Sequence, residues 1–323
     1  MNAMIVDSTA LPEQVVRDVL ASSFQSAGQR CSALRVLYLQ KDIADNLLEM
    51  LFGAMDELRL GNPALLSTDV GPVIDEAAKA KIEAHCAKYA STGRVLKSLA
   101  VPEKGLFVAP TVIRLDSIAE LKEEIFGPVL HVVTFEAGDI NKVVDMINAT
   151  GYGLTFGLHT RVDKRVAQIC NRIRVGNIYV NRNQIGAIVG SQPFGGEGLS
   201  GTGPKAGGPE YVKRFMQTES ATPVASDVIP AVGAGALQPV IDSLDNSQWA
   251  VASDRLEKLK ELFSGMDILF SSLEHDAQPM PGPTGELNVL STHARGTVLC
   301  LGPDLKSAMH HAVLDRKSTR LNS

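Results

Sequence analysis

Cysteines are few in this sequence, and their spacing is irregular. The four cysteines, Cys31, Cys86, Cys170 and Cys300, include no C-x-x-C pair. This scatter argues against a zinc site and against a disulfide framework, since both need cysteines at short or recurring spacings. Each thiol is expected to be a small buried hydrophobic side chain unless its surroundings indicate otherwise, and the chain suits a reducing cytoplasm.

Long apolar runs and a large excess of either charge are also missing. No hydrophobic stretch approaches the roughly 20 residues that a membrane-spanning helix needs. The formal net charge of −5 gives no reason to expect nucleic acid as a partner, because nucleic-acid-binding proteins normally carry a basic surface. Met1 to Ala10 has neither the basic nor the long apolar region of a secretory signal. These absences favour a cytoplasmic location.

Apolar segments with helical and strand spacing alternate along the first part of the chain. Of the 323 residues, 45% are hydrophobic, which is enough for a sizeable core. Thr9 is expected to cap the first helix, with Pro12 in its first turn. Alternating strands and helices predict an α/β domain with a mainly parallel sheet. Helices are predicted from the Thr9 cap to Gly28 and for Ile43 to Leu58, Asp139 to Ala149 and Val162 to Arg172, and strands for Arg35 to Gln40, Val129 to Phe135, Leu154 to His159 and Gly176 to Asn181.

The composition changes near residue 190. Ser191 to Pro209 is rich in glycine and proline, which predicts a long functional loop. A Pro/Ala/Gly/Val-rich linker follows, so a domain boundary is expected at about residue 225. Trp249 to Phe263 is predicted to be helical and Thr297 to Leu301 to be a strand, in a second and incomplete unit. Arg316 to Ser323 continue no pattern, which indicates a tail or a foreign addition.

Cys31 lies on a short connection between two predicted core elements. The preceding helix ends at Gly28, and a buried strand begins three residues after Ser32. A thiol held there can point into a cleft while neighbouring backbone N–H groups face the molecule that binds it, and such donors stabilise an oxyanion. Arg30 adds positive charge, which favours the reactive thiolate. Cys31 is therefore a candidate nucleophile, although a structural thiol remains the alternative from geometry alone.

A second candidate site is the segment from Glu123 to Val129. Two acidic residues precede Phe126 and a Gly-Pro turn that leads into a strand. Taken alone, this pattern is typical of a solvated helix end followed by a turn. The functional interpretation is a carboxylate that accepts hydrogen bonds from ribose hydroxyls, with Phe126 packed on a flat ring, because carboxylates hold dinucleotide riboses in this way.

The segment Gly196 to Gly201 matches G-x-G-x-x-G formally, but its context does not fit a dinucleotide-binding fingerprint. No clear strand leads into it, and the glycines and proline that follow prevent a helix from starting. A flexible or tightly turned active-site loop is the better interpretation. The seven histidines show no metal-ligand spacing, and no metal site is expected.

Together these segments resemble the aldehyde dehydrogenase superfamily. The resemblance implies that Cys31 is the catalytic nucleophile and that Glu124 and Phe126 contact NAD. It rests on five matches in the same order along the chain, namely Phe24 to Cys31 with its Gly-Gln-x-Cys core, Glu124 to Pro128, Tyr152 to Thr155, Gly176 to Asn181 and Pro193 to Gly196.

A narrower resemblance concerns the segment from Asn181 to Phe194. It is similar to the anchor loop of the L-glutamate γ-semialdehyde dehydrogenases, also called Δ1-pyrroline-5-carboxylate dehydrogenases. This implies that Ser32, Gly186 and Ala187 hold the α-carboxylate and ammonium groups of the substrate. Backbone N–H groups at a Gly-Ala turn suit a carboxylate, because no large side chain blocks its approach. Phe194 is expected to line the aliphatic part of the substrate site.

The whole chain is similar to the C-terminal part of the bifunctional proline utilization A family of bacteria. The segment from Met280 to Glu286 resembles the extra C-terminal domain of the long members of that family. The expected organisation is an aldehyde dehydrogenase catalytic domain over 1–224 with the last edge of the NAD domain at its start, a linker over 225–236, a partial C-terminal domain over 237–315, and a tail over 316–323.

This resemblance places several parts of the complete enzyme upstream of the first residue. They are the general-base Glu, the oxyanion-hole Asn, most of the Rossmann-type NAD domain, and a proline dehydrogenase domain that carries FAD. The expected partners are these upstream domains of the same polypeptide, a small aldehyde substrate, and further copies of the chain in a homo-oligomer.

The implied reaction is the NAD-dependent oxidation of L-glutamate γ-semialdehyde to L-glutamate, the second step of proline catabolism. In the complete enzyme the Cys31 thiolate attacks the aldehyde carbon, hydride passes to NAD, and water hydrolyses the resulting thioester. The isolated chain is expected to be inactive. Two alternatives remain open, namely an aldehyde dehydrogenase for another substrate class and a non-catalytic module that needs its missing half.

Overall fold

The computed structural model describes residues 1–201, 203–209, 211–216 and 277–291. The chain forms two compact units, residues 1–189 with 193–206, and residues 190–192 with 207–323. The predicted boundary near residue 225, the helix over 249–263, the strand over 297–301 and the tail lie outside the described residues. No helix among the described residues is long and apolar enough to cross a membrane.

The first unit is built on a seven-stranded sheet with the order β3-β4-β5-β2-β1-β7-β8. All neighbouring strands are parallel except the pair β3 and β4. This confirms the predicted α/β class with a mainly parallel sheet. The strands are β1 (Asn2–Val6), β2 (Leu34–Gln40), β3 (Val95–Ser98), β4 (Thr111–Arg114), β5 (Val129–Phe135), β7 (Thr155–His159) and β8 (Asn177–Val180).

The helices cover the two faces of this sheet because the chain crosses it in two directions. It first moves outward from β1 through β2 to β3 and β4, and it then returns through β5 to β7 and β8. Since connections between parallel strands are right-handed, opposite directions place the connecting segments on opposite faces. α1 (Pro12–Phe24) and α2 (Lys41–Asp56) share one face, where they contact each other, β2 and β5.

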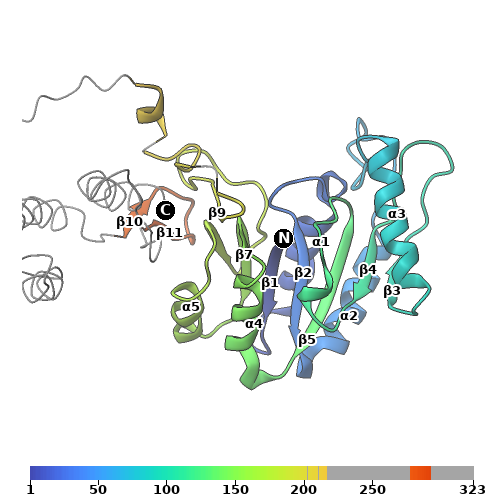
Figure 1. Ribbon diagram of the computed structural model, residues 1–323, viewed down its shortest axis with the longest axis horizontal. Helices are drawn as coiled ribbons and strands as arrows, with labels where there is room; N and C mark the ends of the chain where they lie inside the picture. Colours follow the sequence, from blue (N-terminus) through green and yellow to red (C-terminus); the bar gives the residue numbers. More distant parts are fainter. Residues whose placement is uncertain (202, 210, 217–276, 292–323) are drawn as a thin grey trace, which may run out of the picture. The chain divides into compact units, whose positions relative to one another are not determined.

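Shorter segments belong to the return path. They are the 3-10 turns η2 (Ile118–Glu120) and η3 (Ala137–Asp139), the helix α4 (Ile140–Asn148) and the helix α5 (Asp163–Cys170). α3 (Glu76–Ala90) lies beside β3 and β4 at one end of the sheet, and α5 lies beside the other end (Figure 1).

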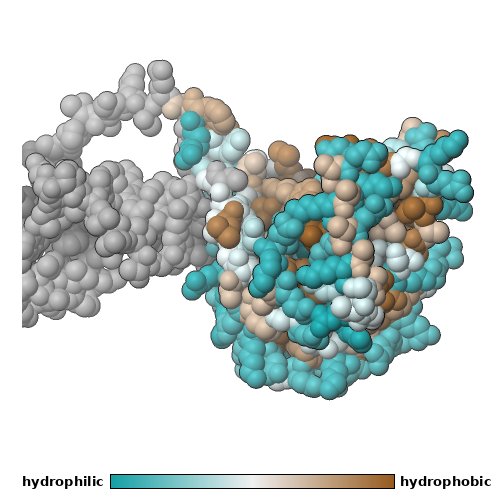
Figure 2. All heavy atoms as spheres, turned by 45° about the vertical axis from the view of Figure 1, so that its right-hand side comes forward, coloured by the Kyte–Doolittle hydropathy of each residue, from teal (hydrophilic) through white to brown (hydrophobic). Residues whose placement is uncertain are grey.

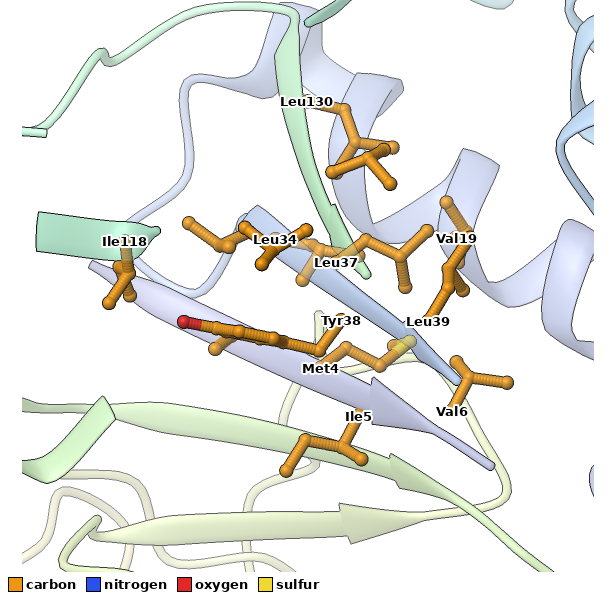
Figure 3. Close-up of a cluster of buried hydrophobic side chains, with 14 of the residues drawn as sticks. Met4, Ile5, Val6, Val19, Leu34, Leu37, Tyr38, Leu39, Ile118 and Leu130 are labelled. Carbon is orange, nitrogen blue, oxygen red and sulfur yellow. The ribbon is translucent and has the colours of Figure 1, made fainter. Parts of the chain in front are cut away.

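Successive side chains of β2 point to opposite faces of the sheet, and both faces are buried. Leu37 and Leu39 point toward Val19 of α1, whereas Tyr38 points away from that helix toward Ile118 of η2 (Figure 3). All five side chains are at most 1% exposed. Burying one such apolar side chain stabilises a fold by about 1.5–3 kcal/mol, so β2 anchors both helical layers.

The first helix begins two residues later than its predicted cap requires. Its N-cap residue is Leu11, which makes no side-chain cap bond, and Pro12 occupies the first turn. The prediction that Thr9 caps this helix was wrong, because its hydroxyl donates to Asp7 at 2.6 Å and accepts from the Arg161 N–H at 2.8 Å. Thr9 thus joins β1 to the connection after β7 rather than starting the helix.

The other predicted elements are present with shifts of a few residues at their ends. The strand Val129–Phe135 has the predicted bounds, and the helices over 43–58, 139–149 and 162–172 correspond to α2, α4 and α5. The pattern missed α3, whose exposed face is charged and which buries few side chains. It also missed three strands of the large sheet, β1, β3 and β4, and the antiparallel pair of β6 (Tyr152–Gly153) and β9 (Glu197–Gly198).

The described part of the second unit contains an antiparallel pair and one short turn. β10 (Gln278–Met280) pairs with β11 (Asn288–Leu290), and Gly285 between them has a positive φ of 87°. The 3-10 turn η4 covers Val212–Phe215.

A buried histidine pair joins α3 to the sheet. His131 of β5 is fully buried, with Nδ1 2.9 Å from the Arg35 carbonyl oxygen and Nε2 2.9 Å from His85 Nε2. A carbonyl oxygen can only accept, so His131 Nδ1 carries the proton and its Nε2 accepts from His85. Burial lowers the pKa of His131 to about 3, and this side chain is therefore neutral in the folded protein at neutral pH.

The stability of the first unit should decrease as the pH falls below about 6.5, the pKa of histidine in an unfolded chain. Because the folded-state pKa of His131 is depressed to about 3, the unfolded chain binds more protons over this interval. The loss amounts to at most about 1.4 kcal/mol per pH unit. His131→Asn keeps a donor at the position of Nδ1 for the Arg35 carbonyl but cannot be protonated, so its unfolding free energy should depend less steeply on pH. Urea denaturation of both proteins at a series of pH values measures the slopes, and equal slopes would refute this assignment.

Candidate active site

The Cys31 segment forms a strained turn between α1 and β2. Three successive residues, Ser26, Ala27 and Gly28, have positive φ angles of 55°, 51° and 64°. Such left-handed backbone costs about 1–2 kcal/mol at a residue other than glycine. A Cβ atom at Gly28 would lie 2.1 Å from the Gly127 carbonyl oxygen, so only glycine fits at the closest approach of the two loops.

Arg35 binds the first half of this turn from inside the protein. Its Nη1 donates to the carbonyl oxygens of Gly28 at 2.7 Å and Gly127 at 3.1 Å, and its Nη2 donates to that of Arg30 at 3.2 Å. The guanidinium is 1% exposed. Burial lowers the pKa of Arg35, although the charge of Glu124 and a hydrogen bond to it act in the opposite direction.

Side chains from β1 and β7 bind the second half of the turn. The Asn2 amide donates to the carbonyl oxygens of Cys31 at 2.7 Å and Ala33 at 2.9 Å. The Thr155 hydroxyl donates to the carbonyl oxygen of Ser32 at 3.2 Å. With the carbonyl groups facing inward, the N–H groups of Cys31 and Ser32 donate to no acceptor within the described chain. They are therefore available to an oxyanion or a carboxylate, as the sequence predicts for Cys31.

Of the three cysteines that the structure describes, Cys31 is exposed whereas Cys86 and Cys170 are partly buried. Burial raises the pKa of the Cys86 and Cys170 thiols, which keeps them protonated and unreactive. The Arg30 side chain, expected from sequence to favour the thiolate, donates to Ser26 Oγ at 3.0 Å. The buried guanidinium of Arg35, bound to the Gly28 and Arg30 carbonyl oxygens, is a second positive charge at the turn that carries Cys31.

The segment Glu124 to Gly127 contacts the Cys31 turn through the same arginine. Glu124 Oε1 accepts from Arg35 Nε at 2.9 Å, and its carboxylate remains 24% exposed. The Phe126 ring is 44% exposed and carries the Arg35 guanidinium 4.7 Å from its centroid. A half-exposed aromatic ring can pack on a flat base, and a half-buried carboxylate can accept hydrogen bonds from ribose hydroxyls. A nucleotide provides both groups.

The predicted anchor loop follows β8 and returns toward the Cys31 turn. Gly186 is exposed and has a φ of 74°, and Ala187 is half-buried. Gln184, two residues earlier, donates to the Ser32 carbonyl oxygen at 3.2 Å. The structure thus connects Ser32 to the Gly186–Ala187 turn by a single buried side chain.

Phe194 is the fourth residue predicted to bind the substrate, and Asn177 binds the residues on both sides of it. The Asn177 amide donates to the Pro193 carbonyl oxygen at 2.9 Å, and its oxygen accepts from the Gly195 N–H at 3.2 Å. Phe194 also exchanges two backbone hydrogen bonds with Ala206, at 2.9 and 2.8 Å. These bonds fix the backbone from which the half-buried Phe194 ring extends.

The Gly196 to Gly201 segment is a tight turn. β9 within it pairs with β6, and the Ser200 N–H donates to the Glu197 carbonyl oxygen at 3.0 Å. A Cβ atom at Gly176 would lie 1.7 Å from the Gly195 carbonyl oxygen, so this loop packs directly on the start of β8. The segment is a closely packed turn, as the sequence indicates, and it does not lead from a strand into a helix.

These segments meet at the edge of the sheet where the parallel strands begin. The Cys31 turn precedes β2, the Glu124 segment precedes β5, and Asn2, Thr155 and Asn177 are the first residues of β1, β7 and β8. Ligands of open α/β sheets usually bind at the opposite edge, beyond the carboxyl ends of the strands. Within the described residues, no group of three or more His, Cys, Asp or Glu side chains is placed to hold a metal ion.

The outer surface at this edge is partly apolar. In Figure 2 hydrophobic side chains are frequent toward the upper rim of the first unit, whereas its lower side is mainly hydrophilic. Ile74, which is 80% exposed, lies beside the Cys31 turn because its N–H donates to Gln29 Oε1 at 2.9 Å. Phe126 adds a second exposed apolar group.

Sequence reasoning missed the residues that support this site. Asn2, Arg35, Asn177 and Gln184 each bind a backbone carbonyl group at least 16 residues away in the sequence. The available signal was a polar residue within an apolar strand pattern, such as Arg35 before Val36 to Leu39. The sequence alone does not show which carbonyl groups such a residue reaches.

Comparison with known proteins shows the family to which this chain belongs. The family model described as "Aldehyde dehydrogenase family" matches residues 1–221. The chain belongs to the aldehyde dehydrogenase family. Among curated relatives, the Bifunctional protein PutA of Escherichia coli (strain K12) is 50% identical over 96% of this chain and 24% of its own length, and that of Klebsiella aerogenes is 49% identical over the same shares.

Other members of the aldehyde dehydrogenase family match a shorter part of the chain. A 1-pyrroline-5-carboxylate dehydrogenase of Bacillus cereus (strain B4264) is 38% identical over 68% of this chain and 43% of its own length. A crystal structure of bifunctional proline utilization A covers 66% of this chain and 22% of its own, with a TM-score of 0.65 and 55% identity. A Thermus 1-pyrroline-5-carboxylate dehydrogenase with bound NAD covers 67% and 42%, with a TM-score of 0.62 and 34% identity.

Replacing Arg35 by Met should destabilise the protein by about 3–5 kcal/mol, because it leaves Glu124 and three inward-facing carbonyl groups without their donor. Arg35→Lys should recover only part of this loss, since one ammonium group cannot reach the acceptors that a planar guanidinium reaches. Arg30→Met is the matched control, because the Arg30 side chain is exposed and binds only Ser26 among the described residues. Urea unfolding measures all three variants. Equal stability of Arg35→Met and Arg30→Met would contradict the role of Arg35.

Proposed function

We propose that the complete protein containing this chain oxidises L-glutamate γ-semialdehyde to L-glutamate with NAD, in proline catabolism. The chain spans about a quarter of the length of the PutA relatives it matches, so the activity is assigned to the longer polypeptide. The observation that carries the proposal is the exposed Cys31 on a turn whose carbonyl groups accept hydrogen bonds from buried side chains, while the Cys31 and Ser32 N–H groups donate to no acceptor among the described residues.

This geometry suits covalent catalysis on an aldehyde. The Cys31 thiolate forms a bond to the aldehyde carbon, and the electron pair of the C=O bond moves to the oxygen. The Cys31 N–H is placed to donate to that oxyanion, which stabilises the tetrahedral adduct. Loss of hydride from the carbon gives a thioester, and attack by water releases the carboxylic acid and restores the thiol.

The chain offers two groups for the nucleotide. NAD supplies the acceptor for the hydride when it is bound. The half-buried Glu124 carboxylate can accept from ribose hydroxyls through Oε2, which lies 3.9 Å from the Met1 amino group, and the Phe126 ring offers an apolar surface. The Thermus relative that carries NAD supports this assignment.

The substrate assignment depends on three groups around the anchor loop. Ser32 and the backbone N–H groups of Gly186 and Ala187 are proposed to bind the α-carboxylate and ammonium of the substrate. Phe194, whose backbone is fixed by Asn177, is proposed to pack on its methylene groups. The name of the 1-pyrroline-5-carboxylate dehydrogenase relatives supports a substrate of this class.

The relatives named bifunctional also indicate a second activity on the same polypeptide. We propose that an upstream domain with FAD oxidises proline and supplies the precursor of the aldehyde. The homo-oligomer expected from the family resemblance stays a prediction.

Cys31→Ala in the full-length protein should abolish aldehyde oxidation and leave NAD binding nearly unchanged, because the thiol forms the covalent bond whereas other groups hold the nucleotide. Activity is followed by NADH absorbance, and NAD binding by calorimetry. Cys170→Ala, which removes a partly buried thiol on α5, is the matched control and should keep full activity. Residual activity of Cys31→Ala above about a thousandth of wild type would contradict a covalent route.

The full-length protein should prefer glutamate semialdehyde to butanal by about 10⁴ or more in kcat/KM, because a site built to pair a polar group strongly rejects analogues that lack it. Ala187→Pro deletes one N–H donor and should reduce that preference with little change toward butanal. Ala187→Gly keeps the donor and serves as the control. The measurement is kcat/KM for both aldehydes in the three proteins. Equal use of butanal by the wild type would instead support an aldehyde dehydrogenase for another substrate class.

A further inference from the structure

Gln184 is the most completely buried polar side chain near the anchor loop, with 0% exposure. Its Nε2 donates to the Ser32 carbonyl oxygen at 3.2 Å and to the Thr155 hydroxyl at 3.3 Å. Its backbone N–H donates to Ser22 Oγ at 3.2 Å. One residue therefore joins the end of α1, the Cys31 turn, the start of β7 and the loop that leads to Gly186.

These contacts form a closed triangle. The Thr155 hydroxyl accepts from Gln184 and donates to the Ser32 carbonyl oxygen at 3.2 Å, which also accepts from Gln184. Because a carbonyl oxygen can only accept, the amide nitrogen must face Ser32, and the orientation of the amide is fixed. All three sides of the triangle are buried.

The Gln184 amide is less favourable for stability than an apolar side chain of the same size would be. Gln184 Oε1 is buried and has no hydrogen-bond partner in the described chain, and an unpaired buried polar atom is destabilising. A methionine of similar length would fill the same space without an unpaired atom. The feature that only the amide provides is a fixed register between Ser32 and the anchor loop.

We propose that Gln184 is a positioning residue that sets the distance between the Cys31 turn and the Gly186–Ala187 turn. The proposal rests on the function proposed above. With the aldehyde carbon at Cys31 and the α-carboxylate at Gly186 and Ala187, this distance selects amino-acid semialdehydes by the number of methylene groups between the two ends. Gln184 acts through Ser32 and the anchor loop and touches no reacting atom.

The test compares full-length wild type with Gln184→Met on three aldehydes. These are glutamate semialdehyde, its homologue with one more methylene group (2-aminoadipate semialdehyde), and butanal, which has no carboxylate. In the variant, kcat/KM for glutamate semialdehyde should fall by about 10- to 100-fold, mainly through KM, and its preference over the longer homologue should shrink toward one. The value for butanal and the rate of Cys31 alkylation by iodoacetamide should stay within about threefold of wild type.

Two further variants complete the design. Gln168→Met makes the same replacement at an exposed glutamine of α5 that binds Asn141, and it should leave all three values unchanged. Thr155→Val removes one corner of the triangle with little change of shape, and it should lower the preference for glutamate semialdehyde in the same direction. Thr155→Val carries the test if Gln184→Met does not fold.

The outcomes separate this inference from the proposed function. If the wild type shows no preference for glutamate semialdehyde over butanal, the proposed function fails whatever Gln184 does. If that preference exists and Gln184→Met and Thr155→Val leave it unchanged, the positioning role is wrong. An equal loss toward all three aldehydes would also overturn it, because it would mean that Gln184 only supports the fold.

Discussion

A buried arginine is the interaction on which the rest of the site depends. The Arg35 guanidinium donates to carbonyl groups of the Cys31 turn and of the segment before β5, and it pairs with Glu124. These bonds hold Gly28 and Arg30, directly after the left-handed residues Ser26 and Ala27, and so help to offset the strain of this turn. The same side chain lies on the Phe126 ring. A single cation thus joins the proposed nucleophile to the proposed nucleotide contacts.

This arrangement also offsets an unfavourable charge near Cys31. The Cys31 turn follows the C-terminal end of α1, and this end of a helix carries a partial negative charge that disfavours an anion nearby. The N–H groups of Cys31 and Ser32, which have no acceptor among the described residues, and the buried positive charge of Arg35 act against that field. Because Arg35 is enclosed by protein, its charge is screened less by salt than a surface charge would be.

Four of the seven strands of the large sheet, β2, β5, β7 and β8, could be predicted from the sequence, because burial and periodicity are local properties of the chain. The strands β1, β3 and β4 were missed. Val129–Phe135 is mainly apolar, and it forms β5 with the predicted bounds. Thr9 was misassigned because its residue type suits a helix cap, whereas its partners Asp7 and Arg161 come from two different strand ends. α3 was missed because its helical face buries few apolar side chains.

The site was predictable only in part, because sequence patterns report local properties and not contacts between distant segments. Cys31 and the Gly186–Ala187 turn were indicated by residue type and by family resemblance. The residues that hold them in place were not, since Gln184 lies 152 positions from Ser32 and only the folded chain brings the two together. Positions that make contacts of this kind carry no local pattern. They are found by following each buried carbonyl group to its donor.

The central claim is that Cys31 is the nucleophile and that the anchor loop brings the substrate to it. The most direct measurement is mass spectrometry of the full-length protein after brief alkylation with iodoacetamide, with and without glutamate semialdehyde. The account predicts that the Cys31 peptide is labelled first and that the aldehyde protects it, while labelling of Cys86 and Cys170 stays slow and unaffected. Faster labelling of Cys86 or Cys170, or no protection of Cys31 by the aldehyde, would contradict the account.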